Sequence, residues 1–207
     1  EYFLIFTLKN TNYLMTQGNT WKNFFLKYID NKNKIIVQQN WINTCYYNNK
    51  RDFTNKKINI LYLGWVDKQK GIFDLLEVFK KLVVDQKRKN ISLIIAGKGK
   101  DFDLLISEVK RLKIHKNIKI KGWVNKDEKL KILKESDIYV HPSYFEGFPN
   151  SLLEALSSGI PSVATNVGSI PDLISHNKNG YLYNPGKIDD LENFLIKLID
   201  DLDLRKL

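Results

Sequence analysis

The sequence predicts an α/β fold, in which a Rossmann-like parallel sheet carries helices on both faces. Short apolar runs, typical of buried strands, alternate with longer segments in which apolar residues recur at the spacing of helical turns. The loops that contain glycine follow the predicted strands. Because parallel strands are joined by crossover connections of helical length, this alternation indicates a parallel sheet that is covered on both sides.

The composition fits a globular protein without a membrane-spanning segment. Of the 207 residues, 43% are apolar, which is sufficient for a packed core. No apolar run approaches the roughly 18 residues that span a bilayer, and no signal-peptide pattern opens the chain. Cys45 is the single cysteine and cannot form an internal disulfide, which fits a reducing compartment. We therefore expect a cytoplasmic protein, with the inner face of the membrane as an alternative location.

The net charge of +10 is compatible with nucleic acid, an acidic membrane surface or an anionic substrate as partner. The lysines are scattered through almost every segment, which favours a general bias of composition over a dedicated basic patch. No motif of the usual nucleic-acid-binding spacing is present. We therefore expect no nucleic-acid partner, and peripheral membrane association stays open.

The first fifty residues resemble part of a domain. We expect a strand, a helix and a strand at residues 3–8, 20–29 and 34–38, followed by a linker rich in Asn, Lys, Tyr and Thr at residues 44–57. A single unit of this kind cannot bury both of its faces. We therefore expect residues 1–50 to be the partial tail of a domain plus a linker, with an upstream portion missing, and residues 51–207 to form the second domain.

The pattern becomes regular from residue 58 onward. Strands are expected at residues 58–64, 91–96, 118–120, 137–140, 162–164 and 180–183. Helices are expected through residues 72–83, 104–112, 130–133, 152–156, 170–174 and 188–202. In such a sheet the loops after the strands gather along one edge, where ligands bind near the reversal of strand order.

Two carboxylates lie on either side of a predicted helix start. Glu146 and Glu154 are separated by eight positions, and a loop with Gly147 and Pro149 lies between them. First-turn amides of a helix lack intrahelical partners and attract anions, and an ionised carboxylate can accept both hydroxyls of a vicinal diol. A phosphate beside two such carboxylates suggests a nucleotide sugar. The alternative is a pair of helix-capping acids on a solvated face.

Lys70 and Gly71 also follow a strand and open a helix. This order places an ammonium near a helix start, where a phosphate would bind. The alternative is an ordinary surface lysine.

The residues around the two carboxylates carry a resemblance to a known family. His141-Pro142-Ser143 before them and Ser158-Gly159-Ile160-Pro161 after them resemble the donor-site signature of retaining GT-B glycosyltransferases. Residues 58–185 as a whole resemble the C-terminal, nucleotide-sugar-binding half of glycosyltransferase family 4. The resemblance implies that the residues before the linker belong to an N-terminal, acceptor-binding domain.

The resemblance also implies roles for individual residues. Glu146 would bind hydroxyls of the donor sugar, Glu154 the ribose hydroxyls and Lys70 the diphosphate. Backbone amides near the helix start would face the sugar and diphosphate, with Pro149 unable to donate. The expected catalytic residue is Glu146, and the expected substrate-binding residues are Lys70, Gly71, Trp123, Val124, Gly147, Phe148, Asn150, Ser151 and Glu154.

Trp123 and Trp65 each follow a predicted strand of the second domain. Gly122-Trp123-Val124 resembles the turn that borders the nucleobase, with Trp123 or Val124 packing on the base; the alternative is that Trp123 closes the core. Trp65 occupies the position where the family usually carries an arginine, and an indole cannot replace a guanidinium fork. Either Lys68 or another cation substitutes, or the diphosphate is held less tightly.

Other candidates for catalysis or metal binding are weaker. His141 could act as a general base, but its place at a strand end favours a structural histidine. Asp101-Phe102-Asp103 looks like a metal-binding motif, yet its place at the start of a helix favours N-capping. No group of His, Cys or carboxylates has metal-ligand spacing, so we expect neither a required metal nor another cofactor.

The predicted function is transfer of a sugar from a nucleoside diphosphate donor to a saccharide or lipid-linked acceptor. The resemblance implies retention at the anomeric carbon and a role in surface polysaccharide or glycan synthesis. We expect this chain alone to bind donor weakly and to turn over little or nothing. The alternatives are another GT-B enzyme, such as a sugar-nucleotide epimerase or a phosphorylase, and a non-enzymatic basic binding module.

Overall fold

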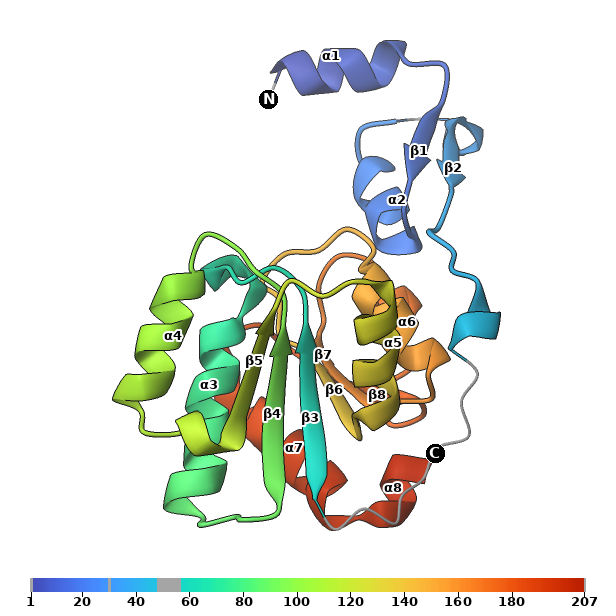
Figure 1. Cartoon of the computed structure of the whole chain (residues 1–207). Coiled ribbons are helices and arrows are strands. Elements are labelled where there is room, and N and C mark those ends of the chain that lie inside the picture. Colours follow the sequence, from blue (N-terminus) through green and yellow to red (C-terminus); the bar gives the residue numbers. More distant parts are fainter. Residues whose placement is uncertain (1, 30, 48–56, 207) are drawn as a thin grey trace.

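Six parallel strands form the central sheet of the computed structural model, which describes residues 2–29, 31–47 and 57–206. The strands lie in the order β5-β4-β3-β6-β7-β8 (Figure 1). Their bounds are Ile58–Leu63 (β3), Ile91–Ala96 (β4), Ile118–Gly122 (β5), Ile138–His141 (β6), Ser162–Thr165 (β7) and Gly180–Tyr183 (β8). The predicted strands from residue 58 onward are therefore confirmed to within a few residues.

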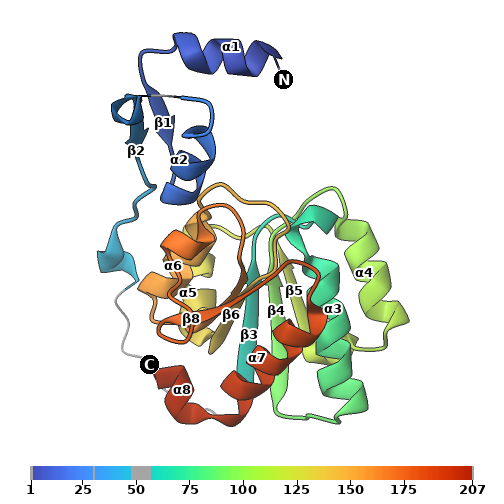
Figure 2. The ribbon, with the colours of Figure 1, turned by 180° about the vertical axis from the view of Figure 1, so that it is seen from behind.

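Helices cover both faces of this sheet, as the sequence predicted (Figure 2). One face packs against α3 (Ile72–Lys80), α4 (Phe102–Arg111) and α7 (Ile188–Asp200). The other face packs against α5 (Lys126–Glu135) and α6 (Asn150–Ser157). Short elements complete the chain: α8 (Leu202–Lys206), the 3-10 turns η1 (Lys32–Lys34), η2 (Thr44–Tyr46), η3 (Lys68–Lys70), η5 (His115–Asn117) and η6 (Ile170–Asp172), and the π-helical η4 (Lys81–Asp85).

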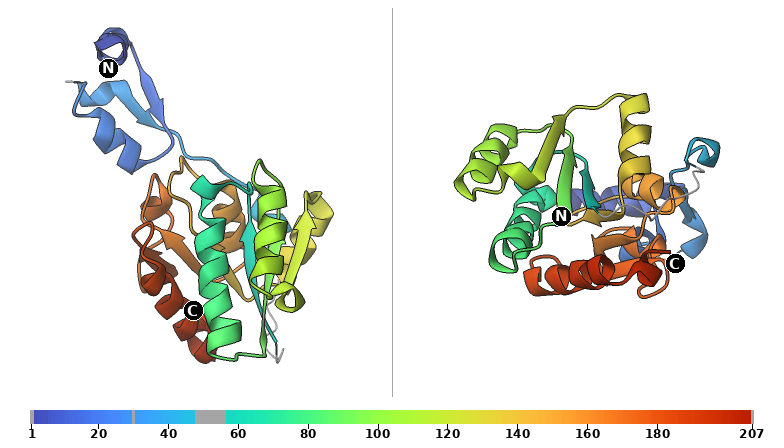
Figure 3. Two further views of the ribbon diagram at one scale, coloured as in Figure 1. Left: turned by 90° about the vertical axis from the view of Figure 1, so that its left-hand side faces the viewer. Right: turned by 60° about the horizontal axis from the view of Figure 1, so that its bottom comes forward.

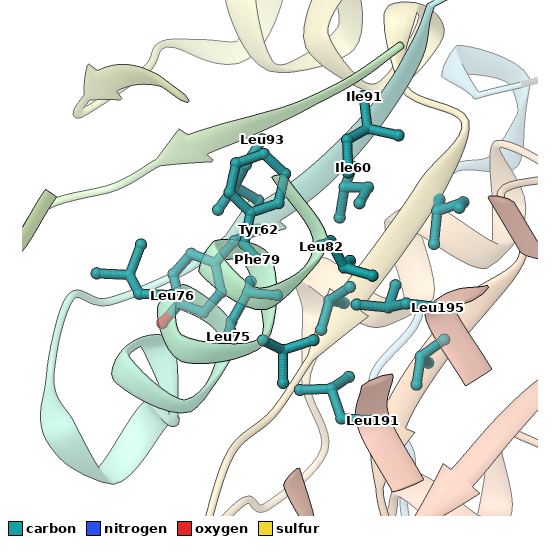
Figure 4. Close-up of a cluster of buried hydrophobic side chains, with 14 of the residues drawn as sticks. Ile60, Tyr62, Leu75, Leu76, Phe79, Leu82, Ile91, Leu93, Leu191 and Leu195 are labelled. Atoms are coloured by element: carbon teal, nitrogen blue, oxygen red, sulfur yellow. The ribbon is translucent and has the colours of Figure 1, made fainter. Parts of the chain in front are cut away.

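The core explains why apolar runs became strands. Along β3, Ile60 and Tyr62 join the cluster under α3 and α7, whereas Leu61 and Leu63 join the cluster under α5 and α6. Side chains alternate between the faces of a strand, so a strand that is buried on both faces is apolar at most positions, and in β3 only Asn59 is polar. Figure 4 shows the first cluster, in which Leu75 and Phe79 of α3 meet side chains of the sheet and of α7.

The order of the strands creates a ligand-binding edge. The chain runs outward from β3 to β4 and β5 and then returns to the other side of β3 with β6. The loops after β3 and β6 therefore lead in opposite directions, which opens a crevice at their carboxyl ends. The loops that begin at Gly64 and Pro142 border this crevice.

The N-terminal residues form a small separate unit of two helices and two parallel strands (Figure 3). The elements are α1 (Tyr2–Asn10), β1 (Leu14–Thr16), α2 (Asn19–Phe25) and β2 (Ile35–Val37). The prediction of a strand at residues 3–8 is wrong, because these residues are helical. Strands need a partner, and β1 rather than this segment pairs with β2. The predicted second strand and an N-terminal part of the predicted helix are confirmed.

This unit lies beyond the carboxyl edge of the large sheet (Figure 1). The Asn19 amide donates to Asp172 Oδ2 at 2.6 Å, and the rings of Trp21 and Phe145 meet edge to face at 5.8 Å. Both Asp172 and Phe145 belong to loops that follow strands of the large sheet. Of the predicted linker, residues 48–56 lie outside the described residues. No helix in the described ranges is long and apolar enough to cross a membrane.

Candidate functional site

A cleft with two adjoining compartments lies at the carboxyl edge of the sheet. The first, here called the Glu146 compartment, has a volume of about 320 Å³. The second, the Glu154 compartment, has a volume of about 300 Å³. The two share Leu63, Gly64, Trp65, Asn150 and Ser151 as lining residues. The cleft thus follows the crevice between β3 and β6 and continues toward β4 and β5.

Three side chains donate to one oxygen of Glu146. Its Oε1 atom accepts from Lys70 Nζ at 2.7 Å and from Ser143 Oγ at 2.8 Å, and it lies 3.0 Å from His141 Nε2. Its Oε2 atom has no hydrogen-bond partner among the residues that the structure describes. The side chain is therefore fixed through one oxygen and keeps the other available as an acceptor.

Glu146 is held in its ionised form. Burial acts to raise the pKa of this carboxyl, but the hydrogen bonds from His141, Lys70 and Ser143, with the neighbouring positive charge, outweigh burial and lower the pKa to about 2. An ionised carboxylate only accepts hydrogen bonds. Glu146 can therefore accept from hydroxyl groups but cannot supply a proton near neutral pH.

A buried chain of hydrogen bonds joins Glu146 to the start of α6. His141 Nδ1 lies 3.0 Å from the Tyr139 hydroxyl, which also contacts Ser151 Oγ at 3.0 Å. Since the carboxylate of Glu146 only accepts, we assign the proton on Nε2 of His141 to the contact with Glu146. Burial raises the pKa of the Tyr139 hydroxyl well above its usual value, so this hydroxyl stays protonated.

Glu154 is the centre of a second cluster. Its Oε1 atom accepts from Lys129 Nζ at 2.5 Å and from the Tyr47 hydroxyl at 3.0 Å. Glu154 is buried on α6, whereas Lys129 comes from α5 and Tyr47 from the segment after β2. Burial, followed by the charge and hydrogen bond of Glu154, raises the pKa of Tyr47 to about 12. Three separate segments of the chain thus converge on one carboxylate.

The first turn of α6 lies between these two clusters. Pro149 occupies the N-cap position and no side chain caps the helix there. First-turn amides have no intrahelical acceptor and carry the positive end of the helix dipole. Asn40 donates from Nδ2 to Phe148 O at 3.1 Å and to Asn150 Oδ1 at 3.0 Å, which braces the loop that leads into the helix. The first turn therefore offers an anion site within the cleft.

Comparison with known proteins identifies the family of this chain. Residues 47–206 match the protein family described as glycosyl transferases group 1. The chain belongs to this family. An uncharacterised glycosyltransferase of Methanocaldococcus jannaschii is 32% identical over 147 residues, which cover 71% of this chain and 37% of that protein. The N-acetyl-alpha-D-glucosaminyl L-malate synthase of Bacillus anthracis is 30% identical over 166 residues, with 76% and 42% covered.

The solved structures agree on the fold. A mutant of S. aureus TarM, in complex with fondaparinux, alpha-GlcNAc-glycerol and UDP, superimposes with a TM-score of 0.84 at 22% identity, covering 99% of this chain and 40% of that chain. The predicted GT-B type of α/β fold is therefore confirmed, whereas the narrower assignment to family 4 stays a prediction. The chain spans 37% and 42% of the length of the two curated relatives named above.

Most of the predicted site residues of this glycosyl transferase line the cleft. The Glu146 compartment is lined by Lys70, Glu146, Phe148, Asn150 and Ser151, and the Glu154 compartment by Trp123, Val124, Asn150, Ser151 and Glu154. Gly71 and Gly147 line neither compartment. Gly71 has a φ of 66°, and a Cβ there would lie 2.0 Å from Pro142 O, so this glycine permits close packing of two loops.

Trp123 does not close the core, so that alternative is wrong. It is 67% exposed, and its ring meets that of Trp65, which is 61% exposed. Neither Lys68 nor any arginine lines the two compartments; their cations are Lys70 and Lys129.

Asp101 lies at the N-cap of α4 as predicted, but its side chain makes no hydrogen bond to that helix. Its Oδ2 atom accepts from the Lys68 amide at 2.8 Å. A carboxylate at that position can reach either its own helix or the adjacent loop, and the loop after β3 lies within reach. Within the described ranges no group of three or more His, Cys or acidic residues could hold a metal, and the expectation that none is required stays a prediction.

Sequence reasoning missed Lys129, Tyr47 and Asn40. Lys129 lies on an amphipathic helix among other lysines, and nothing in its spacing distinguishes it from Lys131 or Lys134. Asn40 lies in the loop between β2 and η2 and Tyr47 directly follows η2, so their contacts depend on the path of the chain. His141 was interpreted as structural, and its buried place at the end of β6 agrees with that, although it also contacts Glu146.

Proposed function

We propose that this chain is the donor-binding part of a retaining glycosyltransferase that moves a sugar from a nucleoside diphosphate to a saccharide or lipid-linked acceptor. One observation carries the proposal: Glu146 and Glu154 face adjoining compartments of a single cleft, with the first turn of α6 between them. Hydroxyl acceptors on either side of an anion site match a ligand with a diphosphate between two polyhydroxyl groups.

The donor would lie along the cleft in a defined direction. Its ribose would contact Glu154 and its base would lie toward Trp123 and Val124. Its diphosphate would meet the first-turn amides of α6, near Ser151. Its sugar would enter the Glu146 compartment, where the free Oε2 atom of Glu146 can accept from hydroxyls.

The proposed chemistry depends on charge and position. As the bond from the sugar to the diphosphate breaks, negative charge develops on the leaving group. Lys70 and the α6 amides would stabilise that charge, because they are already oriented before reaction. Glu146 would hold the sugar in place through an ionised carboxylate. Retention at the anomeric carbon is what the family resemblance implies.

The acceptor and the cellular setting belong to the same proposal. The TarM structure contains UDP and alpha-GlcNAc-glycerol, which supports a nucleotide donor and a saccharide acceptor here. We propose surface polysaccharide or glycan synthesis at a cytoplasmic site. The net charge of +10 supports peripheral association with an acidic membrane surface, where a lipid-linked acceptor would lie. In this proposal residues 1–50 belong to the acceptor-binding domain and residues 51–207 form the donor domain.

Calorimetric titration with UDP-, GDP- and ADP-sugars tests the proposal. We expect at least one of these to bind, and Glu154→Gln and Lys70→Met each to weaken it about tenfold or more, as for the loss of a charged hydrogen bond. Lys131→Met is the matched control, since Lys131 is an exposed lysine outside the cleft. Absence of binding by every donor would overturn the proposal. If the protein instead binds anions with a steep dependence on salt, and if Glu146→Ala leaves that binding unchanged, the chain is a basic binding module.

A further inference from the structure

Trp65 and Trp123 meet although their strands are not neighbours. Trp65 follows β3 and Trp123 follows β5, and β4 lies between these strands in the sheet. The centroids of the two indole rings are nevertheless 5.9 Å apart, with 60° between the ring planes. The two side chains therefore bridge across the end of β4.

Gly97 makes this bridge possible. It is the residue that follows β4, and its amide donates to Gly122 O at 2.6 Å, which ties the loops after β4 and β5 together. A Cβ at Gly97 would lie 1.8 Å from Gly64 O, so no other residue could let the loop after β3 approach so closely. Gly97 thus lets the loops after β3 and β5 both approach the end of β4, and these are the loops that carry the two indoles.

The backbone beneath Trp65 is also fixed. The Tyr62 hydroxyl donates to Trp65 O at 2.6 Å. The Gly64 amide donates to Ala96 O at 3.0 Å, and the Val66 amide donates to Lys98 O at 3.1 Å. These bonds extend the pairing of β3 with β4 past the ends of the strands. The indole of Trp65 thus projects from a rigid base.

Both indoles present exposed faces to the cleft. They line the Glu154 compartment, and 61% of Trp65 and 67% of Trp123 is accessible to solvent. Because the rings already touch at a steep angle, a planar group would stack on an outer face and would not insert between them. Trp65 lines the Glu146 compartment as well, so it stands at the junction of the two.

We propose that Trp65 and Trp123 together form an aromatic platform for the base of a nucleoside diphosphate, and that binding of the donor depends on this stacking more than on its phosphates. This inference rests on the proposed function. Glu154 lines the same compartment as the two rings, so an aromatic surface and a diol acceptor occur together, as a nucleoside requires. Trp65 brings no charge to the junction, where the diphosphate would pass.

Titrations with parts of the donor test the platform. The probes are uridine, guanosine and adenosine, their diphosphates, and inorganic pyrophosphate, with binding followed by calorimetry and by quenching of tryptophan fluorescence. We expect Trp65→Ala and Trp123→Ala to weaken the nucleosides and nucleoside diphosphates about 5- to 100-fold, the range for loss of base stacking. The two alanine variants should bind pyrophosphate with the same affinity as the wild type. Trp41→Ala is the control, because Trp41 is 80% exposed and lines neither compartment.

The variant Trp65→Arg should change the affinities for pyrophosphate and for nucleosides in opposite directions. A guanidinium at the junction would add a phosphate contact and remove one face of the platform. We expect this variant to bind pyrophosphate more tightly than the wild type, with a steeper dependence on salt, and to bind the nucleosides more weakly. Trp65→Phe and Trp123→Phe, which keep an aromatic face, should retain most of the nucleoside affinity and show that the fold is intact.

Three results would overturn the inference. If nucleoside diphosphates bind and the two alanine variants bind nucleosides as the wild type does, the platform is wrong while the proposed function stands. If the folded alanine variants lose as much affinity for pyrophosphate as for nucleosides, the indoles maintain the phosphate site and do not bind the base. If the wild type binds none of the nucleotides or nucleotide sugars, the proposed function and this inference both fail.

Discussion

His141 Nε2 lies 3.0 Å from Oε1 of Glu146, inside a pocket where the histidine is almost completely buried. This contact links the carboxylate of Glu146 to Tyr139 and, through Tyr139, to Ser151 at the start of α6. In the proposed function Glu146 would meet the sugar and Ser151 the diphosphate. One hydrogen-bonded chain would therefore orient groups that contact two parts of the donor.

Replacement of His141 by glutamine should affect the sugar end of the donor selectively. A glutamine amide can take the place of one imidazole nitrogen but not of both, so the hydrogen-bonded chain from Glu146 to Tyr139 is broken and Glu146 loses its fixed orientation. We expect affinity for a nucleoside diphosphate sugar to fall about tenfold, the size of one charged hydrogen bond, while affinity for the nucleoside diphosphate alone is unchanged. Calorimetry on both ligands measures this difference.

The control for that prediction is His115→Gln, because His115 is exposed in η5, which precedes β5, whereas the cleft loops follow the carboxyl ends of the strands. Equal losses for the sugar nucleotide and the free diphosphate would mean that His141 supports the general fold of the site and has no special relation to Glu146.

The low pKa of Glu146 makes stability depend on pH in a defined direction. Its folded-state pKa of about 2 lies below the ordinary value of 4.5, so folding favours the ionised form. The resulting stabilisation is fully present above about pH 4.5 and is lost as the pH falls toward 2. We expect it to amount to about 2–3 kcal/mol, and we expect Glu146→Gln to lose less stability than the wild type between pH 6 and pH 3. Urea unfolding at the two pH values measures this.

The exposed Glu135 provides the control, since Glu135→Gln should leave the pH dependence of the wild type unchanged. If the wild type and Glu146→Gln lost the same free energy of unfolding on acidification, the ionised state of Glu146 would contribute nothing to folding.

The strands of the large sheet could be predicted because their pattern has one physical cause. A parallel strand with helices on both faces is buried and largely apolar, as in β4, where all six residues are buried and five of them are apolar. The N-terminal error has a matching cause. Residues 3–8 are apolar in the same way, but an apolar run alone does not separate a strand from a helix, and the available partner for β2 decided the outcome.

The predicted residues that line the cleft lie in loops after strands or on α6, the helix that the loop after β6 enters. Glu146, Lys70 and Trp123 all lie in the connections that follow strands, so the topology brings them to one edge. Lys129 reaches the cleft from within a helix, where its neighbours are also lysines. Tyr47 reaches it from the end of the short turn η2. Their contacts with Glu154 depend on the path of the folded chain, which no local pattern encodes.

Lys129 and Glu154 should be strongly coupled in stability. Glu154 is buried, so removing the cation leaves a buried carboxylate whose remaining donor among the described residues is the Tyr47 hydroxyl. We expect Lys129→Met to lower the free energy of unfolding by about 1–3 kcal/mol, and the double variant Lys129→Met, Glu154→Gln to recover part of that loss. Denaturant unfolding of the four proteins in this cycle gives the coupling energy.

The matched control pair is Lys131→Met with Glu135→Gln, an exposed ion pair one turn apart on α5, for which we expect a coupling below about 0.5 kcal/mol. Additive effects of the Lys129 and Glu154 substitutions would show that their contact contributes no stability of its own.

Gly97 and Gly64 face each other across the loops after β4 and β3, and their replacements should differ sharply. A Cβ at Gly97 would lie 1.8 Å from Gly64 O, a backbone atom, and the φ of 139° at Gly97 is one that other residues rarely adopt. A Cβ at Gly64 would have Tyr62 Oη as its nearest neighbour, at 3.8 Å, which is ordinary contact. Steric conflict is therefore confined to one member of the pair.

We expect Gly97→Ala to lower the free energy of unfolding by about 2–4 kcal/mol, since it combines a strained backbone with a clash against an atom that cannot rotate away. Gly64→Ala should change it by less than about 1 kcal/mol. Urea unfolding measures both. Because the loop after β4 also holds the loops of Trp65 and Trp123 together, Gly97→Ala should separate the two indoles, and the fluorescence of the folded variant should change. A variant Gly97→Ala as stable as the wild type would mean that the two loops do not approach as closely as described.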